Sequence, residues 1–137
     1  MPRSGLTPAQ RKFLEDTRFA VVATKNPDGS PHLAVMWYLL DGDDIVVNSA
    51  QGRIKDRNLA ADPRVSVLVE DEYRWIRIDG RASIEHDQAI THEDIRRIAS
   101  RYYQDDRKVA AAMRDNFGKQ HRITYRVPIR QVAGEGF

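Results

Sequence analysis

The chain has 137 residues, of which 41% are hydrophobic and 31% are charged, a composition typical of one soluble globular domain over residues 1–137. Lysine and arginine number 22 and aspartate and glutamate 20, so the net charge of +2 argues against a nucleic-acid partner held by bulk charge. The sequence has no cysteine, which excludes disulfides, thiolate metal sites and a cysteine nucleophile. Because Met1–Gln10 lacks the apolar core of a signal peptide and no apolar run approaches a membrane span, we expect a cytoplasmic protein without a membrane partner.

The N-terminal part of the chain predicts a helix followed by two β-hairpins. Thr7 is a typical N-cap, Pro8 suits the first turn and Gln10 completes a capping box, so a helix should begin here. Phe13 and Leu14 are its expected inward-facing pair. Turns rich in aspartate and glycine then separate three expected strands, Phe19–Lys25, His32–Leu40 and Asp44–Ser49.

Three further helices and three further strands are predicted after these hairpins. Thr91 and Asp94 are an expected capping pair, and Pro63 and Pro128 indicate a helix end and a strand edge or bulge, respectively. The expected helices are Arg53–Asp62, Thr91–Tyr103 and Val109–Phe117. The expected strands are Val65–Glu70, Trp75–His86 and Ile123–Val132. Six strands without repeated βαβ spacing favour an all-β-dominated fold with small helices, a closed antiparallel barrel.

The expected strand His32–Leu40 is apolar on both of its faces. Its two alternating sets are Leu33, Val35, Trp37 and Leu39 on one side and Ala34, Met36, Tyr38 and Leu40 on the other. One face can fill the barrel, but the other needs a cover, because a monomer should not expose so much apolar surface. The cover is a helix, a partner subunit or a flat ligand.

The segment between the third strand and the following helix is a candidate anion site. Three cations, Arg53, Lys55 and Arg57, lie where the helix is expected to begin, and cations there oppose the helix macrodipole. A bound anion would reverse this effect, because free N–H groups, the dipole and the cations would all face it. The alternative is that Arg57 pairs with Asp56 or Asp62 and the other cations are solvated.

Other residues that could carry chemistry give weaker signals. Trp75 shares the polar face of its strand with cations, so it either stacks on a ring system, lies in a subunit interface, or is covered by Tyr73 or the C-terminus. The four histidines have no metal-binding spacing, and no serine lies in a G-x-S-x-G setting. No GxGxxG motif or P-loop occurs. If the protein is an enzyme, a cofactor is therefore expected to supply the chemistry.

Several stretches of the chain together resemble the flavin/deazaflavin oxidoreductase superfamily, the split β-barrel proteins related to pyridoxamine 5′-phosphate oxidase. The main motif is Gly-Arg-Ile-Lys-Asp-Arg-Asn-Leu at residues 52–59. The other matching stretches are residues 23–24, 28–32, 35–38, 62–66 and 80–82. The resemblance implies a six-stranded antiparallel split β-barrel that forms a homodimer, with the cofactor in the groove between the subunits.

The resemblance also implies roles for individual residues. Arg53 and Lys55 would hold the cofactor phosphate with help from Arg57 and Asn58 at the helix start. The remaining implied contacts are Met36 and Trp37 near the ring system, Asn48 and Ser49 along the ribityl chain, and Trp75 from the facing subunit. No catalytic side chain or metal is implied.

Two departures from the family pattern favour a subgroup. Pyridoxamine phosphate oxidases carry an Arg-x-x-Leu-Leu-Lys strand that binds the FMN phosphate, but residues 35–40 here read Val-Met-Trp-Tyr-Leu-Leu without a cation. Their C-terminal Arg-x-His signature is also missing from residues 130–137. The 52–59 motif instead resembles small actinobacterial proteins that use the deazaflavin coenzyme F420. We therefore expect an F420-dependent reductase of a small organic acceptor, the alternatives being an FMN-binding oxidoreductase or a non-catalytic cofactor-binding protein.

Overall fold

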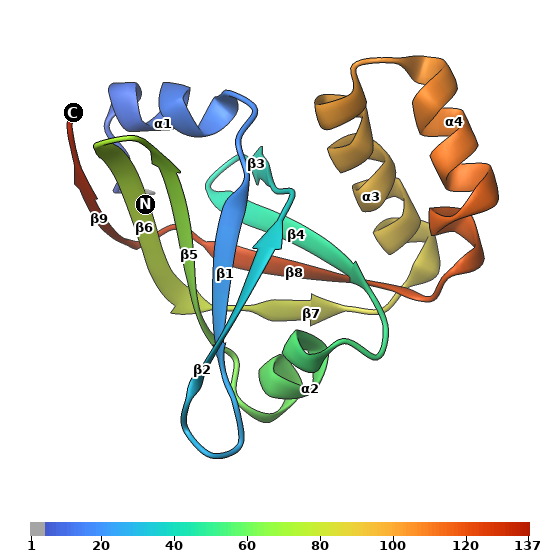
Figure 1. Ribbon diagram of the computed structural model, residues 1–137, viewed down its shortest axis with the longest axis horizontal. Coiled ribbons are helices and arrows are strands. Elements are labelled where there is room, and N and C mark those ends of the chain that lie inside the picture. Colours follow the sequence, from blue (N-terminus) through green and yellow to red (C-terminus); the bar gives the residue numbers. More distant parts are fainter. Residues whose placement is uncertain (1–4) are drawn as a thin grey trace.

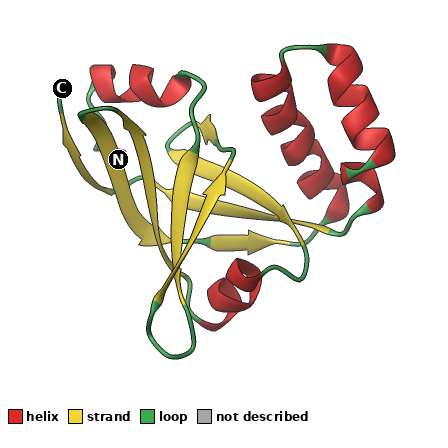
Figure 2. Cartoon of the chain, in the orientation of Figure 1, coloured by secondary structure: helices red, strands yellow, loops and turns green. Residues whose placement is uncertain are grey.

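The computed structural model describes residues 5–137, which are mostly β-structure with four α-helices and one 3₁₀ turn (Figures 1 and 2). Residues 1–4, the start of the segment Met1–Gln10, lie outside the described residues. The helical elements are α1 (Pro8–Glu15), α2 (Ile54–Ala61), α3 (Gln88–Tyr103), α4 (Asp106–Asp115) and η1 (Phe117–Lys119). The strands are β1 (Ala20–Lys25), β2 (Pro31–Met36), β3 (Leu39–Asp41), β4 (Asp44–Ala50), β5 (Arg64–Asp71), β6 (Arg74–Arg81), β7 (Ser83–Glu85), β8 (Arg122–Pro128) and β9 (Gln131–Glu135).

The strands form two antiparallel sheets. The five-stranded sheet has the order β2-β1-β5-β6-β9, and the four-stranded sheet has the order β3-β4-β8-β7. Three runs of chain pass from one sheet into the other, β2 into β3, β6 into β7 and β8 into β9. Counted this way, residues 5–137 contain six strand runs that close on one another, which confirms the expected split barrel.

The expectation of one strand each over His32–Leu40, Trp75–His86 and Ile123–Val132 was wrong, because each range holds two strands. Each run bends between the two sheets, and each bend contains a buried side chain, Tyr38, Ala82 or Ile129. Because an inward-facing residue occupies each bend, apolar residues keep recurring through it and the sequence pattern does not reveal the break. Pro128 is the last residue of β8, so the proline does mark the bend before β9.

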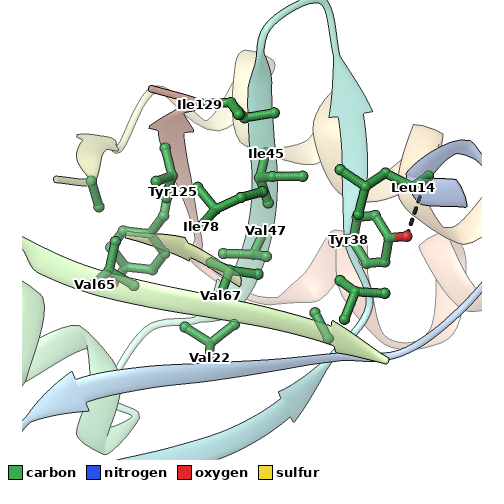
Figure 3. Packing of buried hydrophobic residues seen from close by; sticks show 14 of the residues in the cluster. Leu14, Val22, Tyr38, Ile45, Val47, Val65, Val67, Ile78, Tyr125 and Ile129 are labelled. Carbon is green, nitrogen blue, oxygen red and sulfur yellow. Dashed lines mark hydrogen bonds between the residues drawn. The ribbon is translucent and has the colours of Figure 1, made fainter. Parts of the chain in front are cut away.

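The core fills the space between the two sheets. Figure 3 shows Val22 and Val67 of the five-stranded sheet facing Val47 and Tyr125 of the four-stranded sheet. Tyr38 is fully buried at its bend, and its hydroxyl donates to the backbone oxygen of Leu14 over 2.7 Å. The bend after β2 is thereby attached to α1.

The N-terminal helix confirms its sequence signals. Thr7 is the N-cap of α1, and its side chain and that of Gln10 form the reciprocal capping box. Phe13 and Leu14 are buried, as expected. The following strand begins at Ala20, one residue later than predicted.

The two later helices begin earlier than predicted. Asp87 caps α3, so the expected capping pair of Thr91 and Asp94 was wrong. Thr91 and Asp94 are buried because α3 packs against the four-stranded sheet, where Asp94 accepts a hydrogen bond from Thr124. Helix α4 ends at Asp115, two residues before Phe117. Figure 1 shows α3 and α4 side by side on one flank of the barrel.

None of the helices in the described part of the chain has both the length and the apolar character needed to span a membrane.

Candidate functional site

Six of the predicted site residues line one hollow of about 420 Å³ beside the four-stranded sheet. They come from the end of β2, the bend after it, β4 and the start of α2, and they are Met36, Trp37, Asn48, Ser49, Arg53 and Lys55. The rest of the lining is Val35, Ala50, Ile95, Ile98, Phe117 and Arg122. We call this space the cation hollow, because three cations line it together with apolar side chains.

The start of α2 is built around Asp56. Arg53 is the N-cap, and its backbone N–H donates to Oδ2 of Asp56 over 2.9 Å. Oδ1 of Asp56 accepts hydrogen bonds from Ser49 over 2.9 Å and from Tyr125 over 2.6 Å. A carboxylate in the first turn favours the helix, so it offsets the cations on either side of it. The Ser49 hydroxyl, which was expected to contact the ribityl chain, thus already donates its hydrogen to a side chain of the protein.

Arg122 is a site residue that the sequence analysis missed. It is the first residue of β8 and pairs with Ala50, the last residue of β4, so barrel closure brings it to the cation hollow. Its side chain is buried, and its guanidinium lies 4.9 Å from the ring centroid of Phe117. Nε donates to Oδ1 of Asn48 over 2.9 Å, so the Asn48 amide also has a partner within the protein. No local signal in the sequence marks Arg122 as a site residue, because its burial and its pairing with Ala50 arise only in the fold.

The cations of the hollow are held close together in a partly desolvated space. Burial lowers the pKa of the Lys55 ammonium, and the neighbouring Arg53 and Arg122 lower it further. Burial, followed by the repulsion from Arg53, lowers the pKa of Arg122 to about 10. Asp56 partly opposes both shifts. An anion entering the hollow would relieve this repulsion.

The apolar side chains of the run His32–Leu40 are covered differently in its two halves. Trp37 stacks on Tyr102 of α3 with centroids 4.8 Å apart and an interplanar angle of 9°, so a helix covers the second half of the run. Leu33 and Val35 in the first half stay 64% and 70% exposed. The helix explanation therefore holds only beyond Met36.

Arg57 and Asn58 lie outside the cation hollow. Arg57 lines a second hollow of about 350 Å³, which we call the α2 hollow, and Arg53 lines both. Asp62 pairs with Arg64 and Lys25, and Asp56 has the partners described, so within residues 5–137 Arg57 has neither of the expected ion pairs. Asn58 is buried against β1, where its amide donates to Thr24 and Asn26.

Trp75 also lies outside the hollow of its own chain. It is the second residue of β6 and pairs there with Glu135 of β9, whose side chain accepts a hydrogen bond from the Trp75 indole N–H over 3.3 Å. The C-terminal strand therefore covers it in part, which matches one of the alternatives for this residue. Across residues 5–137, no group of three or more histidines or carboxylates is arranged to hold a metal ion.

The family model for pyridoxamine 5′-phosphate oxidase matches residues 6–127. The chain belongs to this family. The match spans the helix α1, the strands β1 to β7, all of β8 except its last residue, and every residue of the cation hollow, and it ends before β9. The superfamily resemblance noted from the 52–59 motif is thereby confirmed, and the family is one of flavin-binding oxidoreductases.

Solved structures with the same fold differ in what they are described as doing. The conserved hypothetical protein Rv2991 of Mycobacterium tuberculosis is 28% identical with a TM-score of 0.77, over 98% of this chain and 88% of that one. A structure described as an F420 reductase is 23% identical with a TM-score of 0.74, over 93% and 98% of the two chains. HutZ, the heme storage protein of Vibrio cholerae, is 21% identical with a TM-score of 0.73, over 100% and 97%. At these identities the last two support the fold alone.

Proposed function

We propose that the protein is a reductase that uses the deazaflavin coenzyme F420 and transfers a hydride from it to a small organic acceptor. The observation that carries the proposal is the cation hollow. Its lining combines three cations, Arg53, Lys55 and Arg122, with the apolar side chains of Met36 and Trp37. Membership of a flavin-binding family and the shared fold with an F420 reductase support the same conclusion.

The donor set of the hollow fits a cofactor with a flat ring and an anionic group. Charge-assisted hydrogen bonds from Arg53, Lys55 and Arg122 would hold a phosphate, and its negative charge would offset the burial and mutual repulsion that lower the pKa of Lys55 and of Arg122. The apolar faces of Met36 and Trp37 would support the ring and exclude water. The reduced deazaflavin would supply the hydride, so the protein needs only to bind and orient the reactants.

A surplus of cations favours F420 over FMN. FMN ends in one phosphate, whereas F420 continues into a tail of glutamate carboxylates. Arg57 lies in the α2 hollow, which shares Arg53 with the cation hollow, so a tail leaving the phosphate site would meet it. Arg77 on β6 is less suited to this role, because it pairs with Asp79 over 3.1 Å. Arg57 is therefore our candidate for the tail.

We also propose that the protein acts as a homodimer. Leu33 and Val35 project from the outer face of the five-stranded sheet at 64% and 70% exposure, and a second copy would cover them. A two-fold contact is isologous, so each site would occur twice. Trp75 would then contribute to the partner's site rather than to its own.

Two alternatives remain as competing proposals, each favoured by one observation. The family match favours an FMN-binding oxidoreductase. The heme storage protein of the same fold favours a cofactor-binding protein without turnover. Purified protein distinguishes the cofactors, because bound FMN is yellow and the deazaflavin absorbs further to the blue. Steady-state oxidation of reduced F420 with a panel of quinones, enones and tetrapyrroles tests the proposal, and a protein that binds F420 but oxidises it with none of them would be a carrier.

A further inference from the structure

Four buried polar side chains form a continuous chain from α3 to the cation hollow. They are Asp94 on α3, Thr124 on β8, Asn48 on β4 and Arg122 on β8, with exposures of 8%, 0%, 7% and 6%. Thr124 Oγ1 lies 2.8 Å from Asp94 Oδ2 and 3.0 Å from Asn48 Nδ2, and Asn48 Oδ1 lies 2.9 Å from Arg122 Nε. We call these residues the polar relay. Asp94 and Thr124 do not line the hollow, whereas Asn48 and Arg122 do.

The direction of every hydrogen bond in the polar relay follows from Arg122, which can only donate. The Asn48 amide oxygen therefore accepts from Arg122 and the amide nitrogen donates to Thr124, so the Thr124 hydroxyl gives its own hydrogen to Asp94. The oxygen of Thr124 then accepts from the Asn48 amide nitrogen, whose second hydrogen goes to the backbone oxygen of Thr91 over 2.9 Å.

The relay and one further hydrogen bond leave one edge of the Arg122 guanidinium for a ligand. Nε donates to Asn48, Nη1 donates to Gln120 over 2.6 Å, and within residues 5–137 Nη2 has no hydrogen-bond acceptor. The backbone is held as well, because the Gln88 side chain accepts from the Arg122 N–H over 2.8 Å and donates to its carbonyl over 2.9 Å. Thermal rotation of this long side chain is thus restricted before any ligand arrives, which lowers the entropic cost of binding.

We propose that Asp94 and Thr124 are positioning residues that act through Asn48 to hold the Arg122 guanidinium ready for the anionic group of the ligand. The inference rests on the proposed function, because it requires the cation hollow to bind an anion. It differs from that function in assigning a role to two residues that never touch the ligand. Without the Thr124 hydroxyl, Asp94 loses its donor and the Asn48 amide nitrogen keeps only the Thr91 carbonyl as an acceptor, so the amide is held less firmly against Arg122.

The test compares Thr124→Val with Thr124→Ser, which keeps the hydroxyl. Affinities for F420, FMN and inorganic phosphate are measured by calorimetry with the folded full chain. Since a hydrogen bond to a charged group is being disordered, we expect Thr124→Val to weaken binding about tenfold and Thr124→Ser to stay within about twofold of the parent.

In an Arg122→Gln background, Thr124→Val should cause no further loss. Asp94→Asn, which keeps the side-chain volume, should weaken binding in the same direction. Val67→Ala, a core change in the other sheet, controls for lost stability and should leave affinity unchanged.

A second readout needs no ligand. In the parent and in Thr124→Ser, the Nε–H of Arg122 should give an NMR signal because its hydrogen exchanges slowly with water. This signal should be lost in Thr124→Val. Asp94→Asn replaces Thr124→Val in this experiment if that variant does not fold. If no probe binds the parent but the signal behaves in this way, the proposed function fails and the relay stands. An unprotected signal in the parent, or an equal loss of affinity from Thr124→Val with and without Arg122, would overturn the relay.

Discussion

The phenolic oxygen of Tyr125 lies 2.6 Å from Oδ1 of Asp56, and this hydrogen bond joins the strand β8 to the first turn of α2. Both groups are buried, and Asp56 in turn binds the backbone N–H of Arg53 at the edge of the cation hollow. The barrel wall and the helix that carries two of the three cations are therefore linked through one carboxylate.

Replacing Tyr125 with phenylalanine should destabilise the fold. The change leaves Oδ1 of Asp56 with Ser49 as its remaining donor, and a buried acceptor that loses a partner costs about 1–3 kcal/mol. Urea unfolding followed by tryptophan fluorescence measures this loss. Tyr73→Phe, at an 82% exposed tyrosine, is the matched control and should change stability by less than about 0.5 kcal/mol. Equal stabilities for the two variants would mean that the Tyr125–Asp56 contact contributes nothing.

Alkaline conditions should destabilise the protein through its buried tyrosines. Burial raises the pKa of Tyr38 to about 12, and burial together with the bond to Asp56 raises the pKa of Tyr125 as well. In the unfolded chain both ionise near pH 10, so above that pH the unfolded state binds fewer protons and stability falls as pH rises. Each tyrosine contributes a slope of up to about 1.4 kcal/mol per pH unit. Between about pH 10 and 12 the Tyr38→Phe variant should therefore lose stability less steeply than the parent. Parallel slopes would contradict the assignment to Tyr38.

The double variant Arg53→Ala with Lys55→Ala separates a ligand-binding role from a structural one. Losing two charge-assisted hydrogen bonds should cost about 3–6 kcal/mol of binding free energy. This corresponds to a loss of affinity on the order of a hundred- to ten-thousandfold, less if the two residues act together. The ligand-free variant should be as stable as the parent or slightly more so, because the repulsion that lowers the pKa of Lys55 is removed. Calorimetry with F420 and FMN gives the affinity, and thermal melting gives the stability.

Either of two results would contradict the prediction that Arg53 and Lys55 bind the cofactor phosphate. A folded variant that binds the cofactor within about threefold of the parent would place the phosphate elsewhere. A variant that unfolds would make Arg53 and Lys55 structural residues.

Light scattering should give twice the chain mass of 15.7 kDa, in agreement with a homodimer. Leu33→Asp with Val35→Asp should convert the dimer to a folded monomer, because these side chains are already exposed within one chain and become buried only against a partner. Tyr73→Asp, an equally drastic change at an exposed turn, should leave the dimer intact. A monomeric parent at micromolar concentration would rule out the dimer and the role of Trp75 in a partner's site.

Signals from neighbouring residues predicted most helices and strands, whereas features that depend on the pairing of distant strands were missed. Thr7 and Gln10 predicted the start of α1, and the cations of the 52–59 motif located the hollow, because capping and charge clustering depend on neighbouring residues. The bend at Tyr38 could not be predicted, since a buried residue in a bend continues the apolar pattern, whereas Pro128 did indicate an edge or bulge just before Ile129. Arg122 was missed for a related reason, because only the pairing of β8 with β4 brings it beside Asn48.

The order of the strands along the chain has a consequence for biosynthesis. The run from β8 to β9 pairs with β4 and β7 in one sheet and with β6 in the other, so it closes both sheets and is also the last to be made. It carries Arg122 and Tyr125, which complete the hollow and anchor α2. A nascent chain that has emerged only as far as α4 therefore has an open barrel and an incomplete cation hollow. Ligand binding by this protein should be acquired in a single late step, when the final strands dock.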